Sequence, residues 1–324
     1  MIDRRKLMQV LGQVFGAAAL MPLAELTKAT ASPIPAVLRA MAADMQKTAD
    51  AFRAGEAPEL LAGTYDRIFQ HRPSERSIEQ TVHVAYFADP DHSGQRFLYQ
   101  SELAEYGLGF LVVRDDDPRK TIGGVPVARL ADLPQMLRSL AISFQSMREI
   151  HAAELFDNAD VYDAHTVGDG VAMCSPMHPC DGATWANALA TPCDLNGHSL
   201  RHVLEQIRTT FVDQRGLRIS ARGRRLVVPL AIAYDAERAI AQLKADDPFN
   251  TFRFDYEPVV WDYLTKEHRW FVLTTCQGFH WFEREPFSVA CDVDVNKDCV
   301  HVIGHEKRAF ACHDPRAVFM SAAA

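Results

Sequence analysis

A long helical pattern near the middle of the chain is the sequence feature that most constrains its fold. Apolar residues recur there at helical spacing as Leu133, Leu137, Leu140, Phe144 and Met147. Asp132 precedes the pattern as an N-cap, and Pro134 stands in the first turn. The pattern runs to about Phe156, which predicts a helix roughly 35 Å long. Such a helix must bury one face, so the patterns on either side of it decide the fold class.

The patterns before this helix fall into two blocks. Residues 1–78 are rich in alanine and helical in pattern, with Leu38, Met41, Met45 and Phe52 in one helix and Leu60 and Leu61 in a second. Residues 80–130 favour strands instead, with candidates at 81–87, 96–99, 108–113 and 121–128 and a turn at 115–118. We expect an arm followed by an extended β-excursion with polar tips.

The region after the helix is mixed. Residues 157–198 are rich in turn residues, and a helix is predicted over 199–214 with Gly216 as its stop. A buried strand at 226–229 and a helix at 235–245 follow. The last predicted strands are 257–261, 269–274, 288–295, 300–305 and 317–320. Helices and strands therefore do not alternate as in a doubly wound sheet, which predicts the α+β class.

Composition and net charge limit the classes of function that this chain can have. A chain of 324 residues with 48% hydrophobic content can bury a sizeable core. Its formal net charge of -8 argues against a surface that coats nucleic acid, although a shell that only encloses nucleic acid stays compatible with it. The seven cysteines form no CxxC pair, which predicts reduced thiols in a cytosol.

The N-terminus has two interpretations. Arg4 and Arg5 precede an apolar stretch from Leu7 to Leu26, and Ala29-Thr30-Ala31 resembles a cleavage site, as in a twin-arginine export signal. The alternative is an amphipathic arm helix, because Gln9 and Gln13 interrupt the apolar run. We expect the arm helix, and no membrane partner, since the run is too short and too polar to span a bilayer.

The sequence holds no pattern that predicts catalysis. A nucleophile elbow, a phosphate loop, a dinucleotide fingerprint and a zinc-protease helix are all missing. Two groups have zinc-binding residue types without standard spacing: Cys174, His178, Cys180 and Cys193, and His301, His305, Cys312 and His313. The acidic groups Asp292/Asp294 and Asp115/Asp116/Asp117 are expected to face water and to form a turn tip, respectively. We therefore expect no catalytic, cofactor or metal site.

Five arginines form the densest basic run of the chain. They are Arg215, Arg218, Arg222, Arg224 and Arg225. No aromatic residues are interleaved with them, so a single-strand nucleic-acid platform is not indicated. We expect a subunit interface or a solvated face, with phosphate contact as the alternative.

Several separated segments resemble the major capsid proteins of tailed bacteriophages. The first is Asp169-Gly170-Val171-Ala172-Met173-Cys174-Ser175-Pro176-Met177-His178-Pro179, followed by Gly182 and Trp185-Ala186-Asn187. Further similar steps are Asp213-Gln214-Arg215-Gly216, Leu226-Val227-Val228-Pro229, Asn250, Tyr263-Leu264-Thr265 and Trp270-Phe271-Val272-Leu273. The last are Trp281-Phe282-Glu283-Arg284-Glu285-Pro286-Phe287, His305-Glu306-Lys307-Arg308 and Asp314-Pro315-Arg316. The resemblance covers about residues 130–320.

This resemblance implies a Hong Kong 97-like capsid fold. It implies an N-terminal arm over 1–78, an E-loop over 79–130, a P-domain with the long spine helix over 131–195, an A-domain over 196–285 and a return to the P-domain over 286–324. Covalent cross-linking is not implied, because Lys120 is the only lysine of the E-loop and no partner for it is identified.

The function that the resemblance implies is structural. Copies of the chain would form the hexamers and pentamers of an icosahedral head, assembled in the bacterial cytoplasm around non-specifically contacted double-stranded DNA. Further partners would be a portal protein and possible scaffolding and decoration proteins. The arm and the β-excursion fit this function, since ordering them costs backbone entropy unless neighbouring copies bury them. The alternatives are an encapsulin-like compartment with protein cargo and an exported enzyme with a twin-arginine signal.

Overall fold

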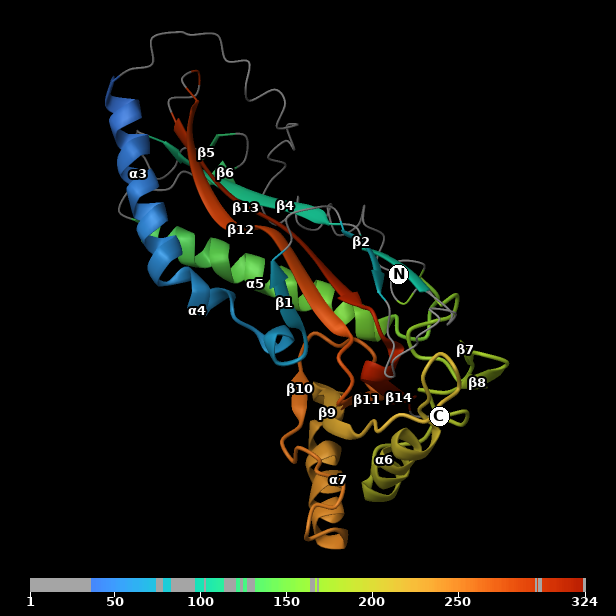
Figure 1. Ribbon diagram of the computed structural model, residues 1–324. Coiled ribbons are helices and arrows are strands. Elements are labelled where there is room, and N and C mark those ends of the chain that lie inside the picture. Colours follow the sequence, from blue (N-terminus) through green and yellow to red (C-terminus); the bar gives the residue numbers. More distant parts are fainter. Residues whose placement is uncertain are drawn as a thin grey trace. The chain divides into compact units, whose positions relative to one another are not determined.

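The computed structural model describes a mixed set of helices and strands (Figure 1), which confirms the α+β class. The described residues are 36–73, 78–82, 97–101, 103–113, 121–122, 125–126, 132–163, 167, 169–294, 296 and 299–322. They divide into two compact units. The first takes its residues from 1–62, 105–145 and 285–307, and the second from 63–104, 146–284 and 308–324.

Two amphipathic helices represent the predicted arm in the first unit. Helix α3 (Ala36–Gly55) buries one stripe at helical spacing, consisting of Leu38, Ala42, Met45, Ala49 and Phe52. Helix α4 (Ala57–Leu61) follows, with Pro58 in its first turn. Glu56 accepts hydrogen bonds from the Arg138 guanidinium at 2.7 and 3.2 Å. The predicted pair of arm helices is therefore confirmed within the described residues.

The predicted long helix is confirmed as α5 (Leu133–Asp157), which has 25 residues. Its first part belongs to the first unit and packs against the long strands β12 (Phe279–Asp294) and β13 (Cys299–Cys312). Phe144 contacts Phe287 edge-on, with ring centroids 5.0 Å apart. Gly304 of β13 lies so close to α5 that a Cβ there would meet Leu140 and Phe144 at 2.9 Å. Glycine is thus required where the helix crosses this strand.

Helix α3 covers part of the edge of β12 through a single side chain. The Gln46 amide nitrogen donates to the carbonyl of Val289 at 3.0 Å, and its oxygen accepts from the Cys291 N–H at 2.9 Å. One glutamine therefore replaces the two backbone partners that a neighbouring strand would supply.

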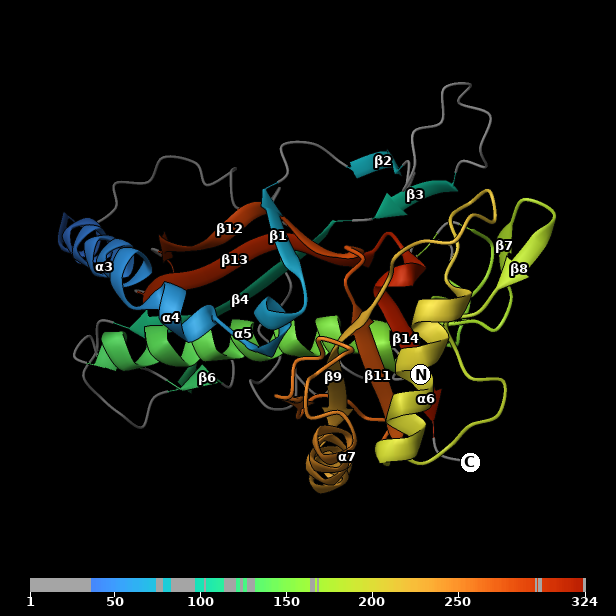
Figure 2. The same ribbon diagram turned by 60° about the horizontal axis from the view of Figure 1, so that its bottom comes forward.

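The second unit is built in layers around a four-stranded sheet of order β10-β9-β11-β14. Its strands are β9 (Gly223–Pro229), β10 (Val259–Trp261), β11 (Arg269–Thr274) and β14 (Val318–Ala322). Helices α6 (Gly197–Thr210) and α7 (Ala233–Asp246) lie next to each other against this sheet (Figure 2). The sequence predicted this sheet only as separate strands.

Alternate side chains of β9 point into two different hydrophobic cores, one on each face of the sheet. Leu226 and Val228 pack with α6 and α7, whereas Val227 packs on the opposite face with Phe156, at the end of α5. Strand β11 likewise places Trp270 and Val272 in one core and Phe271 in the other. Both faces of the sheet are therefore covered, which explains its continuous hydrophobic strands.

Helix α6 is shorter than the sequence predicts. Asn196 caps it by accepting from the N–H groups of His198 and Ser199, and the chain leaves the helix at Phe211. Gly216 does not stop the helix, because it lies in a later turn with φ of 74°. The turn forms because Asp213 accepts from the Leu217 N–H at 2.8 Å, a local bond that competes with the helix.

The remaining elements are short, except for the ten-residue strand β4. They are η1 (Thr64–Arg67), β1 (Gln70–Pro73), β2 (Ile78–Val82), β3 (Phe97–Ser101), β4 (Ala104–Val113), β5 (Thr121–Ile122), β6 (Val125–Pro126), β7 (His178–Cys180), β8 (Ala183–Trp185), η3 (Leu230–Ile232) and η4 (Pro315–Ala317). Strand β1 pairs in parallel with the start of β12, and β4 lies beside β13. Strands β2 and β3 pair antiparallel as a two-stranded ladder.

Several predictions fall outside the described residues. They are the export-like segment 4–31, the turn 115–118 with its three aspartates, Lys120, and the second half of the strand predicted at 81–87. The domain boundaries implied by the resemblance stay predictions. Among the described helices, none combines the length and the apolar character that a bilayer crossing requires.

Candidate functional site

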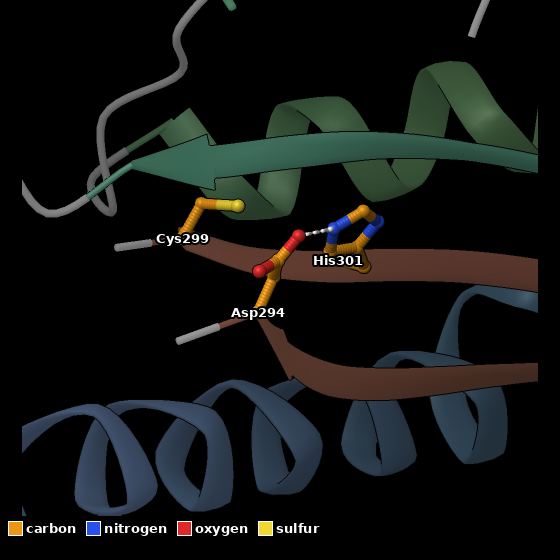
Figure 3. A group of neighbouring side chains, drawn as sticks. All are labelled: Asp294, Cys299 and His301. Carbon is orange, nitrogen blue, oxygen red and sulfur yellow. Dashed lines mark ion pairs between the residues drawn. The ribbon is translucent and has the colours of Figure 1, made fainter. Parts of the chain in front are cut away.

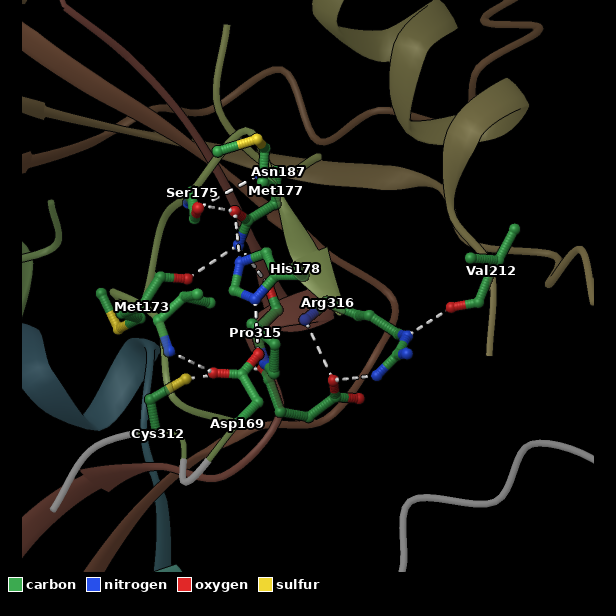
Figure 4. A network of polar contacts seen from close by, with 12 residues as sticks. Asp169, Met173, Ser175, Met177, His178, Asn187, Val212, Cys312, Pro315 and Arg316 are labelled. Carbon is green, nitrogen blue, oxygen red and sulfur yellow. Dashed lines mark hydrogen bonds and ion pairs between the residues drawn. The ribbon is translucent and has the colours of Figure 1, made fainter. Parts of the chain in front are cut away.

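Three of the segments that carry the sequence resemblance meet in one buried polar network of the second unit (Figure 4). Asp169 comes from the loop after α5, His178 from β7 and Asn187 from the segment after β8. Asp314-Pro315-Arg316 approaches from the start of η4. Residues separated by almost 150 positions thus form one site.

His178 is completely buried, and both of its ring nitrogens have partners. Nδ1 lies 2.6 Å from Asp169 Oδ2, and Nε2 lies 2.9 Å from Asn187 Oδ1. The Asn187 oxygen must be an acceptor, because the nitrogen of the same amide donates to two carbonyls. Nε2 therefore donates to Asn187, and Nδ1 is paired with the Asp169 carboxyl group. Both polar atoms of the buried ring are thus satisfied.

Asn187 ties three segments together. Its amide nitrogen donates to the Met173 carbonyl at 2.9 Å and to the Pro315 carbonyl at 2.8 Å. Its oxygen also accepts from the Ser175 N–H at 2.8 Å. Asn187 is fully buried, so each of these bonds satisfies a backbone group that water does not reach.

Aromatic stacking extends the network to Arg316. Trp185 stacks on His178 at 4.6 Å, and the Arg316 guanidinium lies 4.7 Å from the Trp185 ring centroid. Arg316 also binds the Asp314 carboxylate at 3.1 Å and donates to the Val212 carbonyl at 2.6 Å. The buried arginine thus has a charged partner, a carbonyl and an aromatic face.

This network is suited to structure and not to turnover. Its imidazole and its carboxylate are engaged with each other, and their side chains are 0% and 4% exposed. A general base must instead reach a substrate proton. The signature residues therefore hold the loops after α5 and β8 against the C-terminal segment.

A second buried carboxylate escaped the sequence analysis. Glu149 of α5 accepts from the Trp261 indole N–H at 2.6 Å and from the Thr64 N–H. Burial raises the pKa of this carboxyl, and the nearby Asp66 acts in the same direction. Gly63 permits the contact, because a Cβ there would meet the carboxylate. A glutamate within a helical pattern gives no sequence signal for such burial.

Two buried histidines form a further pair in the second unit. The rings of His280 and His313 lie 4.9 Å apart, and the side chains are 4% and 6% exposed. Burial, together with Arg72, lowers the pKa of His280 to about 4. Burial, His280 and Arg72 lower the pKa of His313 to about 3. Both rings are therefore neutral near pH 7.

The structure does not assemble the first zinc group considered from the sequence. His178 is engaged in the network above, and Cys174 and Cys180 lie in different hydrophobic cores. Burial raises the pKa of both thiols, which disfavours the metal-binding thiolate. Cys193 lies 3.5 Å from the Ser321 hydroxyl.

The structure does not bring the four residues of the second zinc group together either. His305 lies 2.9 Å from Glu285, Cys312 is buried beside the Asp314 carbonyl, and His313 stacks on Phe282. Among the described residues, His301 belongs to a group of three ligand-type residues, together with Asp294 and Cys299. All seven cysteines are free of disulfides.

The two acidic residues of β12 differ in their surroundings. Asp292 is exposed, as expected, whereas the Asp294 carboxylate is only 23% exposed and lies 3.5 Å from the His301 ring. The prediction that both face water is wrong for Asp294, because the pairing of β12 with β13 brings a histidine to it.

The basic run is partly neutralised within the chain. Arg215 pairs with Asp213 at 3.3 Å, and Arg225 pairs with Asp255 at 2.8 Å. Arg218 and Arg222 instead line a surface hollow of about 660 Å³ together with Arg208. The hollow is open and also contains Glu205 and Phe252, so its charge is mixed.

Comparison with known proteins gives matches among solved structures. A phage-related protein from Bordetella bronchiseptica RB50 is 11% identical, with 90% of this chain and 97% of that chain covered and a TM-score of 0.48. The capsid of bacteriophage JBD30 is 12% identical, covering 93% and 73%, with a TM-score of 0.39. An encapsulin complex from Synechococcus elongatus PCC 7942 is 12% identical, covering 94% and 95%, with a TM-score of 0.44. No family model and no curated protein matches the chain.

Proposed function

We propose that this chain is a shell-forming structural protein, the major capsid protein of a tailed bacteriophage with a Hong Kong 97-like fold. The observation that carries the proposal is the convergence of its signature segments. Asp169, His178, Asn187 and Arg316 resemble the capsid family in sequence, and they meet in one buried network. Because this network is closed to substrate, its residues support a fold that assembles and not one that catalyses.

Exposed apolar side chains support self-association. Leu230, Tyr234 and Phe249, all in or beside α7, are 64%, 73% and 92% exposed. Leu230 lies just before α7, Tyr234 lies at its start and Phe249 lies just beyond its end, so a partner surface along this helix would bury them. Identical copies arranged in rings would supply that surface.

The ladder of β2 and β3 supports the same proposal. It forms a separate two-stranded sheet among the described residues. A two-stranded hairpin is marginally stable in water unless a further strand or another surface covers it. In a shell, a neighbouring subunit would cover it, as the E-loop interpretation requires.

The finer parts of the proposal concern partners and place. The hexamers and pentamers would enclose double-stranded DNA, and one vertex would hold a portal protein. Scaffolding and decoration proteins are further candidates, and assembly would occur in the host cytoplasm. The net charge of -8 supports weak, non-specific contact with the packaged DNA.

Electron microscopy of the purified, overexpressed protein, with mass photometry alongside, tests the proposal. Closed shells, or rings of five or six subunits, are expected. A uniform population of monomers or dimers would refute it and favour the exported enzyme. Shells that form in cells with protein cargo in place of nuclease-protected DNA would favour the encapsulin-like alternative.

A further inference from the structure

Three side chains with metal-binding chemistry meet between β12 and β13 in the first unit (Figure 3). They are Asp294 near the end of β12 and Cys299 and His301 at the start of β13. One ligand atom of each, a carboxylate oxygen, a thiol sulfur and a ring nitrogen, lies within 4.8 Å of the other two. Cys299 and His301 are two positions apart on one strand, so both side chains point to the same face.

The identity of these atoms selects the class of metal. Thiolate and imidazole ligands favour zinc and similar transition metals, whereas calcium and magnesium prefer oxygen alone. Bonds of about 2.0–2.3 Å in a tetrahedral zinc site place neighbouring ligand atoms about 3.3–3.8 Å apart. The ligand atoms lie within 4.8 Å of one another, which exceeds this spacing by at most about 1.5 Å.

The surroundings give an ion access from one side. Cys299 is fully buried, whereas the Asp294 and His301 side chains are 23% and 30% exposed. The two exposed ligands leave room for a fourth ligand, such as water. The pair of His301 and Asp294, 3.5 Å apart, already holds two of the groups together.

We propose that Asp294, Cys299 and His301 bind one divalent transition-metal ion of the zinc class per chain. On binding, the Cys299 thiol releases its proton and the His301 ring donates a lone pair in its neutral form. The ion would then link the end of β12 to the start of β13. This inference does not depend on the proposed function, since it concerns the ligand geometry of one chain.

Titration of the metal-free, full-length protein with Co²⁺ tests the proposal, because a cobalt–thiolate bond has its own absorption band. One equivalent of Co²⁺ per chain should produce the band, and one equivalent of Zn²⁺ should displace it. Cys299→Ser should abolish the band. His301→Ala and Asp294→Asn should weaken Co²⁺ binding by at least about tenfold.

Cys291→Ser provides the matched control, because Cys291 is a half-buried thiol of β12 that lies three residues before the proposed ligand Asp294. This variant should keep the band and the stoichiometry. The proposal is overturned if Cys299→Ser retains the band, if Cys291→Ser loses it equally, or if the wild-type protein binds well under one equivalent. His301→Ala alters a half-exposed side chain, so it tests the site even if Cys299→Ser fails to fold.

Discussion

Acidification should destabilise the second unit through the buried pair of His280 and His313. The rings lie 4.9 Å apart beside Phe282, and the charge of Arg72 adds to burial in lowering both pKa values. The Nδ1 atom of His280 has no hydrogen-bond partner among the described residues. A proton taken up there would place a charge in an apolar, positively biased environment.

The direction and the magnitude of this change in stability follow from the pKa values of the two histidines. In the unfolded chain both histidines titrate near pH 6.5, whereas in the folded protein they titrate near pH 4 and pH 3. Below pH 6.5 the unfolded chain therefore binds more protons, so stability falls with pH and levels off only below the folded pKa values. At pH 5 both rings are still neutral in the folded protein. Each histidine then costs about 2 kcal/mol of the stability present at pH 7.5, or about 4 kcal/mol for the pair.

Urea unfolding followed by tryptophan fluorescence at pH 7.5 and pH 5.0 measures this loss. The double variant His280→Gln/His313→Gln should lose about 4 kcal/mol less than the wild type between the two pH values. His198→Gln, at an exposed position of α6, should behave like the wild type. The comparison uses the pH dependence of each variant, so a lower starting stability of the double variant does not affect it. An unchanged pH dependence in the double variant would refute the assignment.

Three further predictions concern single side chains. Asn187→Ala removes an amide that satisfies two backbone carbonyls and one backbone N–H, so it should lower the free energy of unfolding by about 2–4 kcal/mol. Urea titration measures this loss, and a loss below about 1 kcal/mol would contradict the role given to this network. Glu56→Gln breaks an exposed pair with Arg138 and should leave the urea midpoint of unfolding unchanged within error, and a clear shift would contradict this expectation. Phe249→Ser should leave subunit stability within about 0.5 kcal/mol but shift mass photometry toward free subunits, and unchanged assembly would show that copies do not bury this residue.

The sequence already pointed to the buried network, through resemblance and not through chemistry. The steps Asp169-Gly170, His178-Pro179, Asn187 and Asp314-Pro315-Arg316 were recognised by their residue types and order. Their hydrogen bonds were not predictable, because the contacts join positions between 9 and 128 residues apart. Hydrogen bonds between such separated positions depend on how the sheets and loops pack, and no local sequence pattern encodes this packing.

Other differences have the same origin. The sequence predicts strand β12 only from Ser288 onward, whereas the strand begins at Phe279. The start was missed because Trp281 and Phe282 are both buried, on opposite faces, so this part lacks the alternation of apolar and polar residues that predicts a strand. Asp294 was expected to face water and Glu149 was not singled out from the sequence, yet both have partners supplied by the tertiary structure. Gly216 was predicted to end helix α6, but the helix ends earlier, and Gly216 lies in a turn that the Asp213 side chain stabilises.

The sequence alone determined what short-range physics controls. The apolar stripes predicted helices α3 and α5, and the hydrophobic run at 269–274 predicted strand β11 with its observed bounds. Only the tertiary structure decided which distant groups meet, such as Asn187 with Pro315 or Glu149 with Trp261. The reason is that helix and strand patterns repeat within a few residues, whereas a buried polar contact forms where separate segments pack and exclude water together.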